Sequence, residues 1–290
     1  MVNNLGVMQG RLLPKYQGRY QAHPVGYWQD EFQIAGKLGL GLIEFIFDYD
    51  QAERNPLLNP EGLAEIRAVS ERAGVRVKTI CADYFMEAPL HGPDRAAVAQ
   101  SGRMLKALLQ NASALGVTDI VIPCVDGSAL RNEQDILDFI QNIRPAGDLA
   151  EQLGVNLALE TDLPPRAFEE LLEALGSASF TVNYDTGNSA ALGYDPLAEL
   201  AAYGDRISDI HLKDRRRGGP SVELGTGDTD FRRFFEALSR TGYDGPLIMQ
   251  AYRDEEGVQI FKKQLEWIRP WLTGRPGGEG AKPMAWEEMP

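Results

Sequence analysis

The stretch Ile207-Ser208-Asp209-Ile210-His211-Leu212-Lys213-Asp214 decides the fold, because it joins a short buried strand to a group of reactive side chains. The apolar residues predict the strand, which ends in an imidazole, an ammonium group and a carboxylate. Three other apolar runs, residues 156–160, 180–185 and 246–250, end in Glu160, Asp185 and Gln250. We therefore expect the strands to be a scaffold and their ends to form one site.

The chain repeats one order of elements: an amphipathic helix, a glycine that ends it and then, in most repeats, a β-rich run. Glycine can take the left-handed conformation that ends a helix. The glycines are Gly39, Gly74, Gly116, Gly154, Gly176, Gly204 and Gly242. The expected strands are residues 5–10, 42–48, 76–85, 119–126, 156–161, 180–188, 207–214 and 246–253. Their continuous Val, Ile and Leu content favours parallel strands covered by helices.

Helix start signals fit the same order. Asn59-Pro60 and Asp195-Pro196 each place a capping residue before a proline, and Asp230 precedes apolar residues at helical spacing. Strands that alternate with helices over this length predict a single (β/α)8 barrel, a TIM barrel, in residues 1–272. The Gly- and Pro-rich residues 273–290 are expected to form a short disordered tail.

A doubly wound open sheet is the alternative fold. Such sheets usually carry a Gly-x-Gly-x-x-Gly turn after the first strand. Here that position reads Met8-Gln-Gly-Arg-Leu12, which lacks the pattern. The barrel is therefore favoured.

Composition excludes several classes of function. The net charge of -13 and the pI of about 4.8 disfavour binding to nucleic acid or to anionic lipid. No apolar run approaches the ~20 residues of a membrane span, and the N-terminus lacks the features of a signal peptide. The two cysteines, Cys81 and Cys124, lie in apolar runs, as expected for buried free thiols. We expect a cytoplasmic protein with no nucleic-acid or membrane partner.

The strand ends predict a metal site. In a barrel the carboxyl ends of the strands form the active-site face, and consecutive strands are neighbours. Glu160, Asp185, His211 and Gln250 are therefore expected to converge. Two carboxylates, one imidazole nitrogen and one amide oxygen suit Mn²⁺, with Mg²⁺, Co²⁺ and Zn²⁺ as alternatives.

The chain resembles the xylose-isomerase-like barrels, which include sugar-phosphate isomerases and epimerases. The similarity is strongest to 3-epimerases of ketopentose 5-phosphates and to hexulose-6-phosphate isomerases, and it covers residues 5–272. It rests on Glu160, Asp185-Thr-Gly-Asn188, His211-Leu-Lys-Asp214, Leu224-Gly-Thr-Gly-Asp-Thr-Asp-Phe231 and Gly242-Tyr-Asp-Gly-Pro-Leu-Ile-Met-Gln250.

The resemblance implies an enzyme acting on a small carbohydrate. It implies that Glu160, Asp185 and His211 bind one divalent metal, and that Glu160 and position 250 face each other across the substrate. Each would then move a proton next to a carbonyl group polarised by the metal. Asn188, in the matched motif, is a candidate substrate contact. Relatives are often dimers or tetramers, so a homo-oligomer stays open.

Gln250 departs from the family pattern, which usually has glutamate at this position. An amide cannot accept and return a proton near neutral pH. A one-base isomerisation on Glu160 or a metal-bound water are two possible replacements. A second acid or base from another strand end is the third, and the candidates are Glu44, Asp83, Asp209 and Lys213. Lys213 is favoured, because alternation places it on the same strand face as His211.

The remaining candidate substrate contacts lie in loops and at other strand ends. Residues 215–221 form a basic loop in an acidic chain, and Arg215 and Arg217 could bind a substrate phosphate. The other candidates are Arg11, just past the first strand, and Glu44 and Asp83, near the ends of the second and third.

Other functions stay open on the same metal site. One is a dehydration, a keto-acid isomerisation or an inosose-type reaction. Another is a barrel that only binds a sugar, because Gln250 has replaced a catalytic glutamate. The DNA-repair endonucleases of this superfamily use a histidine-rich cluster of metals. They are disfavoured here, because the chain is acidic and has 3 histidines.

Overall fold

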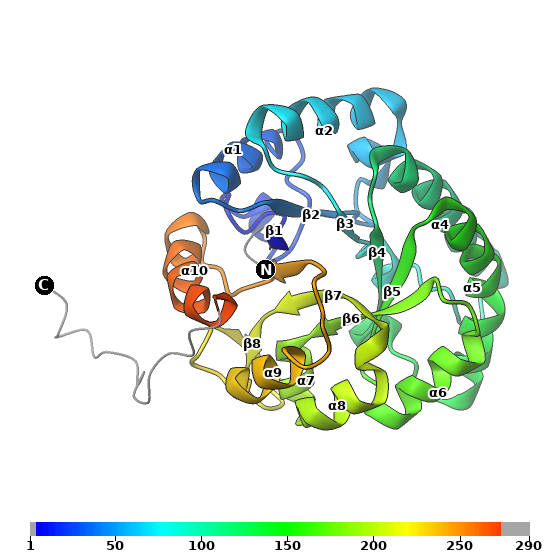
Figure 1. Ribbon diagram of the computed structural model, residues 1–290. Helices are drawn as coiled ribbons and strands as arrows, with labels where there is room; N and C mark the ends of the chain where they lie inside the picture. The colour runs from blue at the N-terminus through cyan, green and yellow to red at the C-terminus, as the bar shows by residue number, and fades with distance from the viewer. Residues whose placement is uncertain (1–3, 274–290) are drawn as a thin grey trace, which may run out of the picture.

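Eight parallel strands close into a barrel inside a ring of helices in the computed structural model, which describes residues 4–273 (Figure 1). The order around the barrel is β1-β10-β7-β6-β5-β4-β3-β2. These strands are β1 (Leu5–Met8), β2 (Leu42–Ile46), β3 (Thr79–Cys81), β4 (Asp119–Cys124), β5 (Asn156–Thr161), β6 (Phe180–Asp185), β7 (Ile207–Leu212) and β10 (Leu247–Met249). The predicted (β/α)8 barrel is confirmed.

The helices begin largely where the sequence predicts. Asn59 accepts a hydrogen bond from the Gly62 N–H (2.7 Å), and Asp230 accepts one from the Arg233 N–H (3.0 Å). The helices are α1 (Gln29–Lys37), α2 (Pro60–Ala73), α3 (Tyr84–Glu87), α4 (Arg95–Leu115), α5 (Glu133–Leu153), α6 (Pro165–Leu175), α7 (Thr186–Leu192), α8 (Pro196–Tyr203), α9 (Phe231–Leu238) and α10 (Val258–Leu272).

The expected glycine stops have positive φ angles with one exception. Gly204 has φ -61° and continues from α8 into a short 3-10 turn, Gly204–Arg206. The expectation of a left-handed residue at this position was wrong, because here the chain enters β7 through another helical turn.

Seven of the eight strands end earlier than predicted, and for two of them the side chains show the reason. The run 180–188 stops at Asp185, because this carboxylate caps α7 by accepting the N–H groups of Gly187 and Asn188. The run 207–214 stops at Leu212, and Asp214 begins β8 (Asp214–Arg215), which pairs antiparallel with β9 (Ser221–Val222). The buried Asp214 carboxylate accepts three backbone N–H groups of the following loop, from Gly225, Gly227 and Thr229.

The barrel interior holds an apolar layer and a polar layer. Alternate residues of the strands form a separate buried cluster inside the barrel: Met8, Leu42, Ile46, Cys81, Val121, Ala158 and Ile248. The residues between them, such as Ile43 and Leu157, belong to the larger core shared with the helices. On several strands the residue two positions further along the inward face is polar: Glu160 follows Ala158, and Gln250 follows Ile248. The alternation thus delivers polar groups to one mouth of the barrel.

Other expectations can be compared with the described residues. Cys81 and Cys124 are both free and buried, as predicted. In the part from residue 4 to residue 273, no helix combines the length and the apolar character needed to cross a bilayer. Apart from Thr273, the predicted tail lies outside the described residues, so the domain boundary at 272 stays a prediction.

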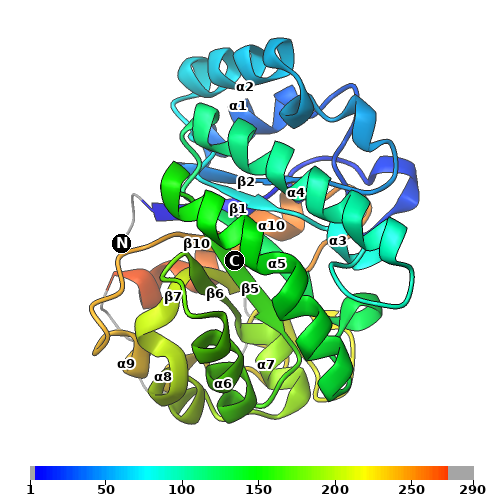
Figure 2. The same ribbon diagram turned by 90° about the vertical axis from the view of Figure 1, so that its right-hand side faces the viewer.

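Close packing of α5 on the barrel depends on a helical glycine. α4 and α5 lie side by side on the outside of the strands (Figure 2). A Cβ added at Gly147 of α5 would lie 2.5 Å from two ring carbons of Phe180, the first residue of β6. A Cβ added at Gly102 of α4 would meet no atom within 4 Å. The two glycines therefore make a matched pair.

We expect Gly147→Ala to lower the free energy of unfolding by about 1–2 kcal/mol, because overpacking outweighs the ~1 kcal/mol gained in helix propensity. Gly102→Ala should raise it by about 0.5–1 kcal/mol. Urea unfolding of both variants checks this. Equal effects of the two substitutions would contradict the packing described for α5.

Candidate active site

Three neighbouring strands place ligand atoms together at the carboxyl end of the barrel. Glu160 lies on β5, Asp185 ends β6 and His211 lies on β7. Asp185 and His211 are register partners. One ligand atom from each of the three side chains lies within 4.8 Å of the others, and all three residues are buried. The structure thus brings together three of the four side chains singled out as metal ligands.

Glu160 is held by two asparagines. The Asn183 amide donates to its Oε2 (2.9 Å), and the Asn188 amide donates to its Oε1. Burial, followed by the negative charge of Asp185, raises the pKa of Glu160 to about 7. A carboxyl group with this pKa can both take up and release a proton near neutral pH.

Asp185 divides its two oxygens between the helix and the site. Its Oδ1 accepts the N–H groups of Gly187 (2.9 Å) and Asn188 (2.8 Å) at the start of α7. Its Oδ2 accepts a hydrogen bond from the Lys213 ammonium group (3.2 Å), which also donates to the Asn188 side-chain oxygen (3.2 Å). Lys213 therefore lies beside the cluster and neutralises part of its charge.

Glu44, in the barrel interior, orients the imidazole ring of His211. Its Nε2 lies 2.7 Å from Glu44 Oε1, whereas its Nδ1 lies 3.6 Å from Glu160 Oε2 and 3.0 Å from the Asn183 amide nitrogen. The tautomer with its proton on Nε2 donates to Glu44 and leaves the Nδ1 lone pair facing Glu160. Orientation of a ligand histidine by a carboxylate is common in metal sites.

Glu44 and Asp209 lie beneath His211, with no exposed surface. Burial raises the pKa of Glu44 to about 7, and burial together with the negative charge of Glu44 raises the pKa of Asp209 well above its usual range. Their ligand atoms and those of His211 form a second group within 4.8 Å of one another. Both side chains thus face the imidazole from within the barrel rather than lining the open mouth.

Gln250 follows β10, two residues after the inward-facing Ile248. Its Nε2 donates to Gln21 Oε1 (3.0 Å), while its Oε1 is buried with no hydrogen-bond partner among the described residues. A buried amide oxygen without a donor is rare in native structures, and a bound cation or ligand is one explanation for it. Glu160, Asp185 and His211 thus offer donor atoms that fit a divalent cation, and the unpartnered Gln250 oxygen is a donor of the same kind.

Arg215 joins the site through Asn188. Its Nη1 donates to the Asn188 side-chain oxygen (2.8 Å), and its Nε and Nη2 donate to the Gly219 carbonyl oxygen. Asn188 thus contacts Glu160, Lys213 and Arg215 at once. Of the residues predicted to bind substrate, Asn188, Lys213 and Arg215 thus lie next to the cluster.

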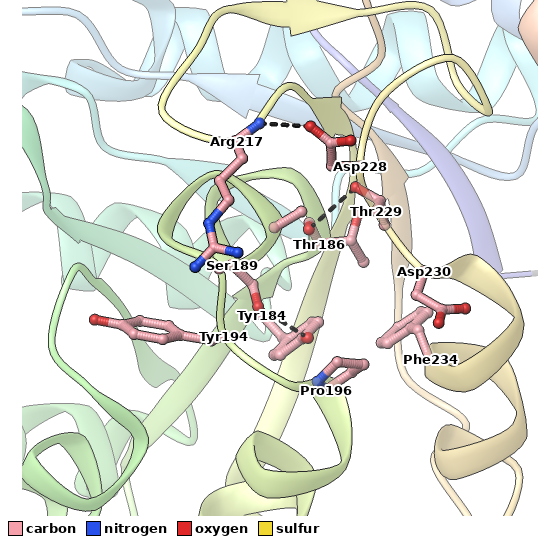
Figure 3. A pocket seen from close by; sticks show the side chains of 12 residues that line it. Tyr184, Thr186, Ser189, Tyr194, Pro196, Arg217, Asp228, Thr229, Asp230 and Phe234 are labelled. Atoms are coloured by element: carbon pink, nitrogen blue, oxygen red, sulfur yellow. Dashed lines mark hydrogen bonds between the residues drawn. The ribbon is translucent and has the colours of Figure 1, made fainter.

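Arg217 lies apart from the cluster. Its side chain extends into a pocket of about 200 Å³ between α7, α8 and α9, which Figure 3 shows from close by. The Arg217 backbone N–H donates to Asp228 (2.7 Å), and the side chain is exposed. Tyr184 and Ser189 line the same pocket. The structure therefore does not bring Arg217 to the candidate ligands.

Arg11 and Asp83 are held in a hydrogen-bond network at the mouth. The Arg11 side chain, 1% exposed, donates to the Ala251 carbonyl oxygen (3.0 Å) and to Gln21 Oε1 (2.8 Å). Asp83 accepts a hydrogen bond from Gln21 Nε2 (2.8 Å) and one from the Cys81 thiol (3.2 Å). Both residues reach the candidate ligands through Gln21.

Sequence reasoning missed two residues of this site. Asn183 was part of a predicted strand, and its alternation with Asp185 was the signal that both face inward. Gln21 lies in an irregular loop between β1 and α1, where no local pattern indicated that it contacts Gln250.

Comparison with known sequences relates the chain to sugar epimerases. L-ribulose-5-phosphate 3-epimerase UlaE of Escherichia coli (strain SMS-3-5 / SECEC) is 29% identical over 263 residues, which cover 86% of this chain and 92% of the relative. The same enzyme of Salmonella paratyphi B is 29% identical over 272 residues, with 90% and 94% covered. These similarities confirm the expectation of an enzyme.

Solved structures share the fold at lower identity. D-psicose 3-epimerase from Clostridium cellulolyticum H10, solved with D-tagatose, superimposes with a TM-score of 0.72 at 16% identity, covering 93% of this chain and 99% of that one. The IOLI protein, solved with a bound zinc atom, has a TM-score of 0.71 at 15% identity, with 93% and 96% covered.

A family model described as the xylose isomerase-like TIM barrel matches residues 32–271. The match spans the strands from β2 to β10 and therefore includes Glu160, Asp185, His211 and Gln250. The chain belongs to the xylose isomerase-like TIM-barrel family.

Proposed function

We propose that this chain is a cytoplasmic, divalent-metal-dependent isomerase or epimerase of a ketose or ketose phosphate. The observation that carries the proposal is the convergence of Glu160, Asp185 and His211 from three neighbouring strands. The similarity to L-ribulose-5-phosphate 3-epimerases supports a small carbohydrate substrate. No observation favours a dehydration or a purely sugar-binding role over this chemistry.

Glu160, Asp185, His211 and Gln250 would hold the metal ion, for which Mn²⁺ is our first choice. When bound, the ion supplies a positive charge that polarises the substrate carbonyl group. Glu160 removes the proton from the carbon next to that carbonyl, and its raised pKa suits both directions of the transfer. Asn183 and Asn188 hold the Glu160 carboxylate in place.

The other groups position the substrate or complete the charge balance. Lys213, beside Asp185 and Asn188, can donate a hydrogen bond to a substrate oxygen. Gln250 can accept a hydrogen bond but cannot transfer a proton near neutral pH. Of the acids proposed to replace it, Glu44 and Asp209 are buried against His211, and Asp83 is bonded to Gln21. Lys213 therefore stays the best candidate for a second acid.

Solvent-proton exchange tests the proposed reaction. Metal-loaded protein in D₂O should incorporate deuterium next to the carbonyl of at least one ketose or ketose phosphate in a panel that includes L-ribulose 5-phosphate. Glu160→Gln should slow this exchange by at least about 10²-fold, because the proton-transferring group is lost. NMR measures the exchange, and Glu173→Gln, on the exposed side of α6, is the control. Equal exchange in both variants would remove Glu160 from the mechanism.

Metal affinity should depend on pH through Glu160. Its pKa is raised from 4.5 to about 7, so in metal-free protein its contribution to stability is complete below pH 4.5 and is lost as the pH rises through 7. Metal binding needs the ionised carboxylate. The Mn²⁺ affinity should therefore rise on the order of tenfold per pH unit between pH 5 and 7 and then level off.

Isothermal titration calorimetry in buffers with different ionisation enthalpies measures the protons released on Mn²⁺ binding. Below pH 7, wild-type protein should release one proton more than Glu160→Gln does. An affinity independent of pH from 5 to 8 would contradict the assignment of Glu160 as a ligand. Removal of the metal with EDTA should lower the Tm, and by more at pH 8 than at pH 5.5.

Arg215 and Arg217 offer a matched pair for locating a substrate phosphate. Arg215 is bonded to Asn188, whereas Arg217 occupies a separate pocket. With a phosphorylated ketose, Arg215→Met should raise KM by on the order of tenfold, because a charge-assisted hydrogen bond is lost. Arg217→Met should change KM less than twofold. Steady-state kinetics with phosphorylated and free sugars check this, and the reverse order of effects would place the phosphate in the other pocket.

A further inference from the structure

The amide of Gln250 has its orientation set by a neighbour. Gln250 is 6% exposed, and its Nε2 donates to Gln21 Oε1. With the nitrogen engaged in this way, the buried oxygen of the same amide has no donor in the part of the chain that the structure describes. The orientation of Gln250 thus depends on which atom Gln21 presents to it.

The amide of Gln21 is fixed by two groups of opposite character. Asp83 Oδ2 accepts a hydrogen bond from Gln21 Nε2 (2.8 Å), and Arg11 Nη2 donates one to Gln21 Oε1 (2.8 Å). A carboxylate offers only acceptors and a guanidinium offers only donors. Turning Gln21 over would therefore place oxygen against oxygen at Asp83 and nitrogen against nitrogen at Arg11.

Arg11 itself cannot easily move. Its Nε donates to the carbonyl oxygen of Ala251, the residue after Gln250, and its Nη1 donates to the Tyr20 carbonyl oxygen (3.2 Å). The guanidinium also lies over the Tyr20 ring, 5.0 Å from its centroid. Fully buried and bonded on several sides, Arg11 is a rigid donor for Gln21.

We propose that Gln21, held by Arg11 and Asp83, is a positioning residue that turns the Gln250 oxygen toward the metal ligands, so that position 250 acts as a neutral oxygen ligand rather than a second base. The inference rests on the proposed function. A glutamate at 250 would place a carboxylate oxygen against Gln21 Oε1. The surroundings of position 250 are therefore built for an amide.

Gln21→Met tests the inference, because methionine has a similar length but neither amide group. We expect the Kd for Zn²⁺ and Mn²⁺ to rise about tenfold, because Gln250 is no longer held in its ligating orientation. Gln29→Met is the matched control, since the side chain of this half-buried glutamine donates a hydrogen bond to the surface Glu65. Its Kd should stay within twofold of wild type.

An exchange of groups between positions 21 and 83 supplies the rescue. In Gln21→Glu/Asp83→Asn the net charge is unchanged, and a carboxylate at 21 can accept hydrogen bonds from Gln250, Arg11 and the new amide at 83. This double variant should bind Zn²⁺ and Mn²⁺ with a Kd within about threefold of wild type, in contrast to the roughly tenfold rise expected for Gln21→Met. A merely structural role of Gln21 would not predict this dependence on donor and acceptor.

The side-chain ¹⁵N signal of Gln250 reads the orientation without any substrate. The signal is identified by its loss in Gln250→Glu, and adding diamagnetic Zn²⁺ should shift it in wild-type protein but not in Gln21→Met. A Kd and a signal shift that are both unchanged in Gln21→Met would overturn the positioning role. Wild-type protein that binds neither Zn²⁺ nor Mn²⁺ would instead overturn the proposed metal site, and with it the ligand role of Gln250.

Discussion

Mutual repulsion and desolvation of buried carboxylates is the constraint on which the centre of this barrel depends. An ionised carboxylate loses its hydration on burial and must be compensated by hydrogen bonds or opposite charge. Asp185 has both kinds of compensation, from the start of α7 and from Lys213. Among the described residues, Glu160 accepts hydrogen bonds from two neutral amides, and its pKa rises to about 7. A divalent cation would supply the charge that the protein lacks at this point.

The same constraint explains the layering beneath the site. Glu44 and Asp209 have no exposed surface, and both Asp209 oxygens lack a hydrogen-bond donor among the described residues. Groups with raised pKa values bind a proton more readily in the folded chain, which reduces the charge buried under His211. The Glu44 carboxylate contacts Nε2 of His211 and fixes the orientation of the imidazole ring. Nδ1 of His211 then lies on the side of Asn183.

Much of this arrangement could be predicted from sequence, because parallel strands align their carboxyl ends. The polar residues at those ends, Glu160, Asp185 and His211, needed only strand order to be placed together. Contacts from irregular loops could not be predicted in this way. Gln21 and Arg217 lie in segments without periodicity. Tertiary packing places Gln21 against Gln250, whereas it places Arg217 in a separate pocket. Family resemblance marked Gln250 as unusual, but only its contact with Gln21 gives a physical account of the amide.

Closure of the barrel also imposes an order of events during synthesis. β1 pairs with β10, so one edge of β1 stays uncovered until β10 has been synthesised. Glu160, Asp185 and His211 are all translated before β10 and Gln250. A nascent chain that stops short of residue 247 therefore presents open strand edges and partly hydrated carboxylates. The set of proposed ligands is thus complete only late in synthesis.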